Sequence, residues 1–267
     1  MLGRQSFGSH PEARFASSDW GRAVSAQHTP RQNHLLAALP PEDYDRLVPD
    51  LEPVSLPLGC TVHGAGDRET HLYFLTAGIV SLFHVMENGA SAEFAIAGSE
   101  GVIGVALFLG GQSTPSQAMV LSAGHAYRLS AQLLKNEFEH GGPLPHLLLR
   151  YTQALITQTG QTAVCNRHHS VDQQLCRWLL LSLDRLSSNE VAMTQERIAS
   201  MLGVRREGVT EAAGHLQAAG LIHYRRGHIT VLDRPLLEKR VCECYAAVKR
   251  ETDRLLPDEI AHGFRPQ

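Results

Sequence analysis

Residues 193–234 read MTQERIASMLGVRREGVTEAAGHLQAAGLIHYRRGHITVLDR, and this stretch decides the fold of the C-terminal half of the chain. Two short helices that cross steeply over a tight turn need a small residue on the first helix, a glycine at the turn and a branched apolar residue on the second helix. Ala199, Gly203 and Val209 supply these residues in that order. The stretch therefore predicts a helix-turn-helix.

Each of the two predicted helices has an apolar face and a polar face. The inner, apolar face consists of Ile198, Leu202, Val204, Ala212 and Leu216. The outer face, which has the size and polarity to enter the major groove of DNA, consists of Arg205, Arg206, Glu207, Thr210 and Glu211. We expect Thr194 to cap the first helix and Gly220 to end the second. A helical subdomain without a nucleic-acid role is the alternative interpretation of the spacing alone.

The segment after the second helix predicts a β-hairpin. LIHYRRGHITVLD, residues 221–233, alternates between apolar and polar residues around a turn at Arg226-Gly227. A hairpin in this position would be the wing of a winged helix-turn-helix.

Charge indicates that any DNA-binding surface is local. The whole chain has a formal net charge of -3, whereas between Ala192 and Arg234 six arginines face four acidic residues. The side chains expected to hold DNA phosphates are Arg205, Arg225, Arg226, Thr194 and Gln195. For Arg225 and Arg226 a solvated loop is the alternative.

The N-terminal half has a different pattern, in which short apolar runs are separated by glycine-rich turns. The runs cover residues 71–77, 79–85, 92–97, 117–123 and 125–130. Evenly spaced short strands of this kind are typical of an antiparallel jelly roll, which can enclose a ligand. The sequence therefore predicts an α+β fold with an N-terminal antiparallel β jelly roll, a long dimerisation helix and a C-terminal winged helix-turn-helix.

A long helix is expected between the two halves, over residues 146–166. Its 3-4 spaced positions, typical of a helix that packs along a partner, are Leu148, Tyr151, Leu155, Gln158, Thr162 and Cys165. We expect the apolar members, Leu148, Tyr151 and Leu155, to form the seam of a homodimer. The polar groups best placed to meet an effector are Gln158, Thr159 and Thr162, and an ordinary surface turn is the alternative.

The expected organisation has five parts. They are a mobile N-terminal tail over 1–33, a jelly-roll sensor domain over 34–143, the dimerisation helix over 144–169, the DNA-binding domain over 170–234 and a C-terminal helical tail over 235–267. One or two short helices are expected within 35–51, and Ser170 is expected to cap a helix over 171–186.

The cysteines favour a reducing compartment, because five is an odd number and no paired framework is visible. Cys242 and Cys244 are expected on a C-terminal helix, where they would point in different directions, and the adjacent His168 and His169 cannot both face one metal ion. The sequence therefore predicts no metal site.

Several classes of protein find no support. The chain has no apolar run long enough to span a membrane and no secretory signal, so the cytoplasm is expected and a membrane partner is not. It also lacks the GxSxG, Walker, HExxH and GxGxxG motifs, so it is not expected to be an enzyme.

The order of a glycine-rich jelly roll, a long helix and T-Q-E-x-I-A-x-x-L-G-V-x-R-E-x-V-T at 194–210 resembles the CRP/FNR superfamily of bacterial transcription regulators. The resemblance covers about residues 34–234. It implies a symmetric homodimer joined through the 146–166 helix, a palindromic double-stranded DNA operator and contact with RNA polymerase. Arg206 and Glu207 occupy the positions that read bases in this family, and Glu211 stands where the best-known member has an arginine.

The chemistry of these side chains agrees with base reading. Arg206 can donate two hydrogen bonds to guanine, and Glu207 can accept one from cytosine. With Thr210 and Glu211 they form the predicted base-reading set. Glu211 in place of arginine should change the preferred base, so the operator sequence of other members does not transfer.

The sensor segment departs from the cyclic-nucleotide pattern that the resemblance implies. Val105 follows Gly104 where a glutamate is expected, and Pro115, Ser116 and Gln117 lie where an arginine and a serine are expected. Without that arginine a cyclic phosphate would lose its strongest partner, which argues against cyclic AMP and cyclic GMP.

Other cofactors are also possible for a sensor domain of this type. No cysteine precedes Cys60, which argues against an iron-sulfur cluster. A haem ligated by His63, His71 or His84 stays open, with a histidine of no special role as the alternative for each. The effector is therefore unknown, and a regulator without any ligand is a further possibility. The rival function is a winged-helix protein used for protein contacts, with a ligand-free sandwich.

Overall fold

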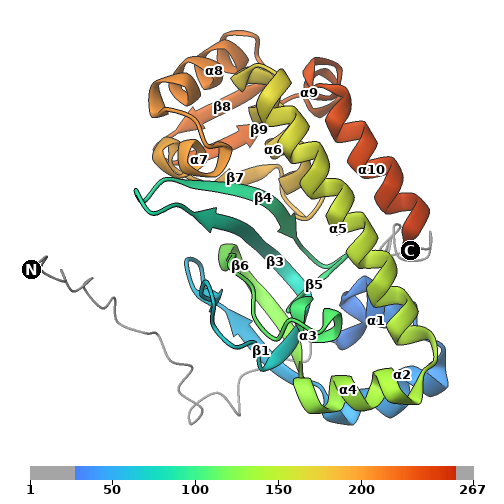
Figure 1. The fold of residues 1–267 in the computed structure, drawn as a ribbon. Coiled ribbons are helices and arrows are strands. Elements are labelled where there is room, and N and C mark those ends of the chain that lie inside the picture. Colours follow the sequence, from blue (N-terminus) through green and yellow to red (C-terminus); the bar gives the residue numbers. More distant parts are fainter. Residues whose placement is uncertain (1–27, 257–267) are drawn as a thin grey trace, which may run out of the picture.

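The computed structural model describes residues 28–256 (Figure 1), so the predicted tail lies outside the described residues as far as residue 27. Residues 30–33 belong to the fold instead. Pro30–Gln32 form a short 3-10 helix, and the buried Asn33 caps the next helix with its side-chain oxygen. The Asn33 Nδ2 donates to the carbonyl oxygens of Leu75 and Gly101 at 2.9 and 2.8 Å. A buried amide with this many partners fixes the chain entry to the sensor domain.

The sensor domain is built on one antiparallel sheet in the order β1-β6-β3-β4. Its strands are β1 (Glu52–Leu56), β2 (Thr61–His63), β3 (His71–Val85), β4 (Ser91–Ala97), β5 (Val102–Ile103) and β6 (Gln117–Ser130). β2 pairs with β6, and β5 pairs with β3. This antiparallel β domain confirms the predicted fold class of the N-terminal half.

Two pairs of predicted strands are each one continuous strand. The runs 71–77 and 79–85 are joined in β3, and the runs 117–123 and 125–130 are joined in β6. The register shifts between Ala77 and Ile79. A Cβ at Gly124 would lie 1.9 Å from the Ala77 carbonyl oxygen, so only glycine lets the two backbones approach this closely. Gly78 and Gly124, each of which lies between two predicted strands, are therefore irregular positions inside long strands.

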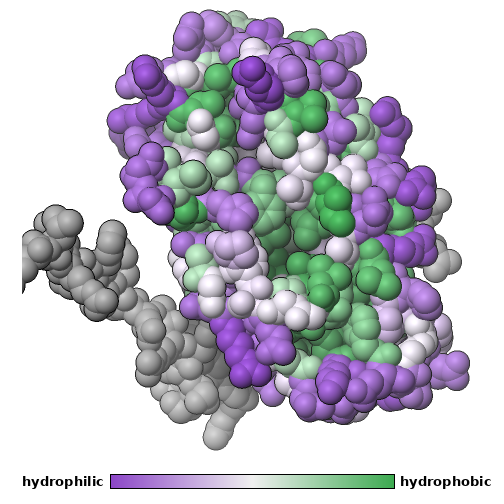
Figure 2. Space-filling model, in the orientation of Figure 1, coloured by the Kyte–Doolittle hydropathy of each residue, from purple (hydrophilic) through white to green (hydrophobic). Residues whose placement is uncertain are grey.

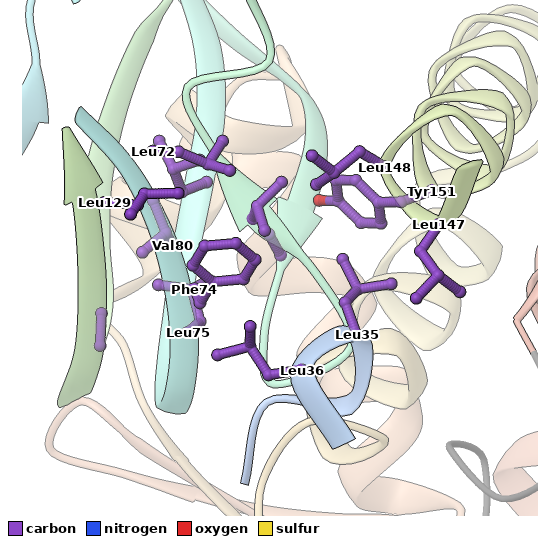
Figure 3. Close-up of a cluster of buried hydrophobic side chains, with 14 of the residues drawn as sticks. Leu35, Leu36, Leu72, Phe74, Leu75, Val80, Leu129, Leu147, Leu148 and Tyr151 are labelled. Atoms are coloured by element: carbon purple, nitrogen blue, oxygen red, sulfur yellow. The ribbon is translucent and has the colours of Figure 1, made fainter. Parts of the chain in front are cut away.

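Short helices close the sensor domain. They are α1 (His34–Ala37), α2 (Pro41–Leu47), the 3-10 helix Val48–Asp50, α3 (Ala106–Leu109) and α4 (Ala131–His140). The helices within 35–51 agree with the sequence prediction. Figure 3 shows the domain core, in which α1 and the first half of α5 (Pro143–His168) direct side chains toward the sheet.

The predicted dimer seam faces this core. Leu148, Tyr151 and Leu155 are 0%, 4% and 8% exposed and pack with Leu35 and Phe74 of the same chain. These three residues therefore cannot form a surface for a second copy, and the prediction was wrong for them. The 3-4 spacing was correct as a sign of helix packing, but the partner is the chain's own sheet and α1.

The C-terminal part follows the predicted order. It consists of α6 (Val171–Leu183), β7 (Glu190–Ala192), α7 (Gln195–Leu202), α8 (Arg206–Ala218), β8 (Ile222–Arg225), β9 (His228–Val231), α9 (Arg234–Arg240) and α10 (Glu243–Leu255). Ser170 caps α6, as predicted, by accepting from the Gln173 backbone N–H at 3.3 Å. The small sheet has the order β7-β9-β8.

Two contacts fix the C-terminal domain to the rest. α10 runs beside α5 (Figure 1), and α7 packs against β4 of the sensor sheet. The second apolar core accordingly contains Ile79 and Ile96 of the sensor sheet together with Trp178 of α6. Within residues 28–256, no helix combines the length and the apolar character needed to cross a bilayer.

Candidate nucleic-acid interface

The helix-turn-helix has the geometry that its spacing predicts. Gly203 ends α7 with a φ of 67°, in the left-handed region that glycine adopts without strain. Ala199 and Val209 are 4% and 0% exposed in the same apolar core. Thr194 caps α7, because its hydroxyl accepts from the Arg197 backbone N–H at 3.3 Å. The predicted inner face is thus the packed one.

The outer face of α8 is open to solvent. Its exposed side chains include Arg206, Glu207, Thr210 and Glu211, all within the first two turns. The Arg206 Nε lies 3.8 Å from Glu196 Oε2, with the Arg206 side chain 63% exposed. Such an exposed pair is weak and leaves the guanidinium available for another partner. The unpaired N–H groups at the start of α8 add partial positive charge there.

The two helix starts are joined by a side-chain bond. The Thr210 hydroxyl donates to Gln195 Oε1 at 2.8 Å and also reaches the Arg206 carbonyl oxygen at 3.1 Å. This bond holds the N-terminus of α7 against the first turns of α8. Two residues from different predicted sets, one for bases and one for phosphates, are therefore in direct contact.

The wing forms the far wall of the same surface. Its turn residues Arg226 and Gly227 have φ values of 50° and 82°, as two-residue hairpin turns require. A hollow between the helix starts and the wing is lined by Thr194, Gln195, Glu196, Arg206, Tyr224, Arg226 and Gly227. Arg205 and Arg225 lie outside this lining and are exposed. Four of the nine predicted DNA-contacting residues, Thr194, Gln195, Arg206 and Arg226, thus line one hollow, and the other five are exposed.

Two family models match the chain. The Crp-like helix-turn-helix domain matches residues 173–240, and the cyclic nucleotide-binding domain matches residues 53–140. The chain belongs to the CRP/FNR superfamily of transcription regulators. For this CRP/FNR regulator, the family matches therefore confirm the resemblance, the predicted fold class and the predicted type of function. The members of this family are transcription regulators.

Individual relatives are distant but cover most of the chain. The global nitrogen regulator of Synechococcus elongatus is 23% identical over 192 residues, which are 68% of this chain and 86% of that protein. The CRP-like cAMP-activated global transcriptional regulator of Mycobacterium tuberculosis is 24% identical over 202 residues, which are 73% of this chain and 90% of that protein.

Solved structures share the fold. A transcriptional regulator of the CRP/FNR family from Eubacterium rectale has a TM-score of 0.61 at 19% identity, covering 77% of this chain and 96% of that one. FixK2 from Bradyrhizobium japonicum has a TM-score of 0.60 at 16% identity, covering 72% of this chain and 98% of that one.

The sensor domain of this CRP/FNR regulator contains a pocket between the sheet, α3 and α5. Its lining includes His63, Glu69, Phe94, Val105, Ser116 and Leu155, and none of the described lining residues is an arginine or a lysine. Glu69 is 7% exposed, with Oε1 3.7 Å from His63 Nε2 and Oε2 without a hydrogen-bond partner. Burial raises the pKa of Glu69 and lowers the pKa of His63.

This lining does not fit a cyclic nucleotide. A phosphate would meet no cation, and it would lie in a pocket that also holds an acidic side chain. Of the three histidines considered for haem, only His63 is in the described lining of the pocket. A single buried histidine that faces a glutamate gives no further support for haem.

The three polar residues predicted for an effector lie elsewhere. The Gln158 amide bridges the backbone of Ile96, accepting from its N–H at 3.2 Å and donating to its carbonyl at 3.1 Å. Thr159 and Thr162 donate to carbonyl oxygens one turn earlier on α5. None of the three lines the sensor pocket. Their assignment to an effector stays a prediction.

One group of side chains was not predicted at all. Cys165, His169, Cys242 and Cys244 have their ligand atoms within 4.8 Å of one another. The expectation that Cys242 and Cys244 point apart was wrong, because Cys242 is the extended N-cap of α10 rather than a helical residue. Donation from Cys165 lowers the pKa of the Cys242 thiol. The available signal was a Cys-x-x-x-His pair at helical spacing together with Cys-x-Cys.

Proposed function

We propose that this regulator binds a palindromic operator as a symmetric homodimer, with α8 of each copy in the major groove. Arg206, Glu207, Thr210 and Glu211 would contact base edges. Phosphate contacts are assigned to Arg205, Arg225, Arg226, Thr194 and Gln195. The observation that carries this proposal is the concave, exposed surface between the start of α8 and the wing.

The dimer surface is assigned to the exposed side of α5. Leu149, Ile156 and Val164 are 48%, 60% and 48% exposed and recur at about two-turn spacing, on the side opposite the sensor core. Gly160 lies on the same side, and a Cβ added there would contact nothing within 4 Å. Figure 2 shows apolar side chains exposed where α5 crosses this face. A second α5 packed along this stripe would bury them.

The proposal also includes partners beyond the dimer. Contact with RNA polymerase and control by an unidentified small-molecule effector are part of the proposal, as is action in the cytoplasm, where the chromosome lies. The sensor pocket suits an uncharged or cationic effector better than an anionic one, because its described lining contains the acidic Glu69 and no arginine or lysine. No membrane partner is proposed.

Selection of bound fragments from genomic DNA tests the function and the symmetry together. We expect enriched fragments to share an inverted repeat whose half-sites lie about one helical turn, roughly 34 Å, apart. Fragments without an inverted repeat would contradict the dimer, and the absence of enrichment would contradict the DNA-binding assignment.

The dimer is tested separately with Ile156→Asp. A charge on the apolar stripe should shift the sedimentation coefficient to that of a monomer and weaken operator binding by more than about tenfold. Leu232→Asp is the matched control, because Leu232 is also 60% exposed and lies after β9, away from α5. If Ile156→Asp stays dimeric while it remains folded, the stripe is not the interface.

A further inference from the structure

The cluster of Cys165, His169, Cys242 and Cys244 joins two segments that are far apart in the sequence. Cys165 and His169 stand one turn apart at the C-terminal end of α5, and Cys242 and Cys244 stand at the start of α10. The three thiols are 0%, 4% and 1% exposed. They form a small core of their own beside the main cores. Four soft donor groups thus converge where α10 meets α5.

Two of the donor-atom distances match those around a single tetrahedral ion. Cys165 Sγ lies 3.6 Å from Cys242 Sγ, and Cys244 Sγ lies 3.6 Å from His169 Nδ1. Zinc-sulfur bonds of about 2.3 Å and zinc-nitrogen bonds of about 2.0 Å place neighbouring ligand atoms roughly 3.5 to 3.8 Å apart in a tetrahedron. All four ligand atoms lie within 4.8 Å of one another. An iron-sulfur cluster, whose ligands bind different iron atoms, would hold them further apart.

The histidine is oriented as metal-bound histidines are. Its Nδ1 faces Cys244, and its Nε2 lies 3.4 Å from Glu243 Oε2. A carboxylate on the outer ring nitrogen fixes the tautomer and strengthens the inner nitrogen as a ligand. Glu243 is therefore placed to support the site without contacting the ion.

A buried cation lies near the cluster. Arg177 is 4% exposed and acts electrostatically on Cys165. Within residues 28–256 its only hydrogen bond is from Nη1 to Thr162 Oγ1 at 3.1 Å, and its Nε has no partner. Three thiolates and one neutral imidazole around a divalent ion leave one net negative charge. The Arg177 charge would offset that charge, which supports an anionic complex at this position.

We propose that Cys165, His169, Cys242 and Cys244 bind one zinc ion per chain in a closed Cys₃His site. Binding replaces the thiol protons, which are released to solvent, and involves no redox step. All four coordination positions are filled by protein, so the site is structural. Residues 170–241, which include α6 to α9 and the whole winged helix-turn-helix, form the loop that the ion closes. The ion would hold both ends of the DNA-binding domain to α5.

Metal analysis of the full chain, purified under reducing conditions with zinc in the growth medium, is the first test. We expect close to one zinc per chain. Cobalt(II) added to the metal-free, reduced protein should give the visible absorption of a tetrahedral thiolate complex, and zinc should abolish it. Zinc should also raise the midpoint of thermal unfolding by on the order of 10 °C.

Variants identify the ligands. Cys242→Ala should remove zinc binding, and His169→Ala, at a partly exposed position, should weaken it by more than about tenfold while the chain stays folded. Glu243→Gln should weaken it by up to about tenfold. Cys176→Ala is the matched control, because Cys176 is equally buried but lies outside the cluster, and it should bind zinc as the wild type does.

Three results would overturn the proposal, and none of them depends on DNA binding. The first is a reduced protein that binds neither zinc nor cobalt(II). The second is an iron-sulfur absorption in protein purified without oxygen. The third is a disulfide between Cys165 and Cys242 in protein trapped directly from cells. Each of these results can be obtained whether or not the protein binds an operator. Failure of the zinc proposal is therefore distinguishable from failure of the DNA-binding assignment.

Discussion

The surface proposed to contact DNA and the sensor pocket differ in the charge that each presents to a ligand. The surface between α8 and the wing is exposed and carries Arg206 and Arg226. The sensor pocket is lined by Glu69 and His63, without a described arginine or lysine. Each region lies in a domain that a family model matches. The difference teaches that one chain can present cationic side chains on an exposed surface and hold a sensor pocket whose described lining has no arginine or lysine.

Burial explains why the two regions respond differently to charge. An exposed arginine keeps its hydration, so it stays charged without a phosphate partner at little cost in free energy. A buried carboxylate loses hydration and shifts toward its neutral form. Two acids of the sensor domain, Glu69 and Glu93, are in this second situation, and burial raises the pKa of both.

The largest effect is expected for Glu93, on β4 where the sensor sheet meets α6. Burial raises its pKa from 4.5 to about 8, although Ser81 donates to it at 2.5 Å and the charges of Arg177 and Arg185 act on it. The folded protein keeps a proton that the unfolded chain loses above about pH 4.5, so the free energy of unfolding falls as the pH rises toward 8. Glu93→Gln removes this loss.

The variant should therefore gain stability over the wild type as the pH rises. Between pH 5 and pH 8 the difference in unfolding free energy should grow by roughly 3 kcal/mol, measured by urea denaturation. Glu87→Gln, at an exposed turn, is the control for the substitution itself. A constant difference for Glu93→Gln between pH 5 and pH 8 would mean that Glu93 is ionised in the folded protein, and the contrast between the two regions would weaken.

The second effect concerns base reading by the exposed surface. Arg206→Ala should weaken binding to the selected operator by about 5- to 150-fold and leave binding to unrelated DNA nearly unchanged, because a bidentate arginine contributes about 1–3 kcal/mol of discrimination. Fluorescence anisotropy with both DNAs measures this. Arg250→Ala, at an exposed position on α10, is the control. Equal losses on both DNAs would move Arg206 from the base-reading set to the phosphate set.

The third effect is smaller and independent of sequence. If Arg225 and Arg226 hold phosphates, the double alanine variant should lose affinity for all DNAs alike. The slope of log affinity against log salt concentration should fall by about two per wing. An unchanged slope would support the alternative that these arginines belong to a solvated loop.

How much the sequence could predict depends on the distance between the residues that make a feature. The helix-turn-helix uses Ala199, Gly203 and Val209, ten residues apart at most along the chain, and its spacing predicted the observed packing. The wing turn and the Thr194 cap are local in the same way. These features were predicted because local geometry alone determines them.

Features made by distant segments were predicted poorly. The 3-4 spacing on α5 showed that Leu148 packs, but it could not show that the partner is Leu35 of the same chain. The Cys165 and Cys242 thiols meet across 77 residues because α10 folds back along α5. The runs 117–123 and 125–130 were predicted as separate strands, because the sequence does not show that Gly124 between them packs on Ala77 of another strand. Tertiary packing decided each case, and a single sequence does not encode such pairings at a readable spacing.

The smallest effect is expected for cyclic AMP. At millimolar concentration it should change operator affinity by less than about twofold, because its phosphate would find no arginine in the pocket. Anisotropy titrations with and without cyclic AMP measure the change in operator affinity. Calorimetry of the free protein measures the binding of cyclic AMP itself. An increase of tenfold or more would require another source of positive potential, and the backbone N–H groups of the Gly104–Ala106 segment, which also lines the pocket, are candidate donors. Backbone N–H groups would then bind the phosphate in place of an arginine side chain. The surface proposed to contact DNA and the sensor pocket would both prefer anions, although only the surface has arginine side chains.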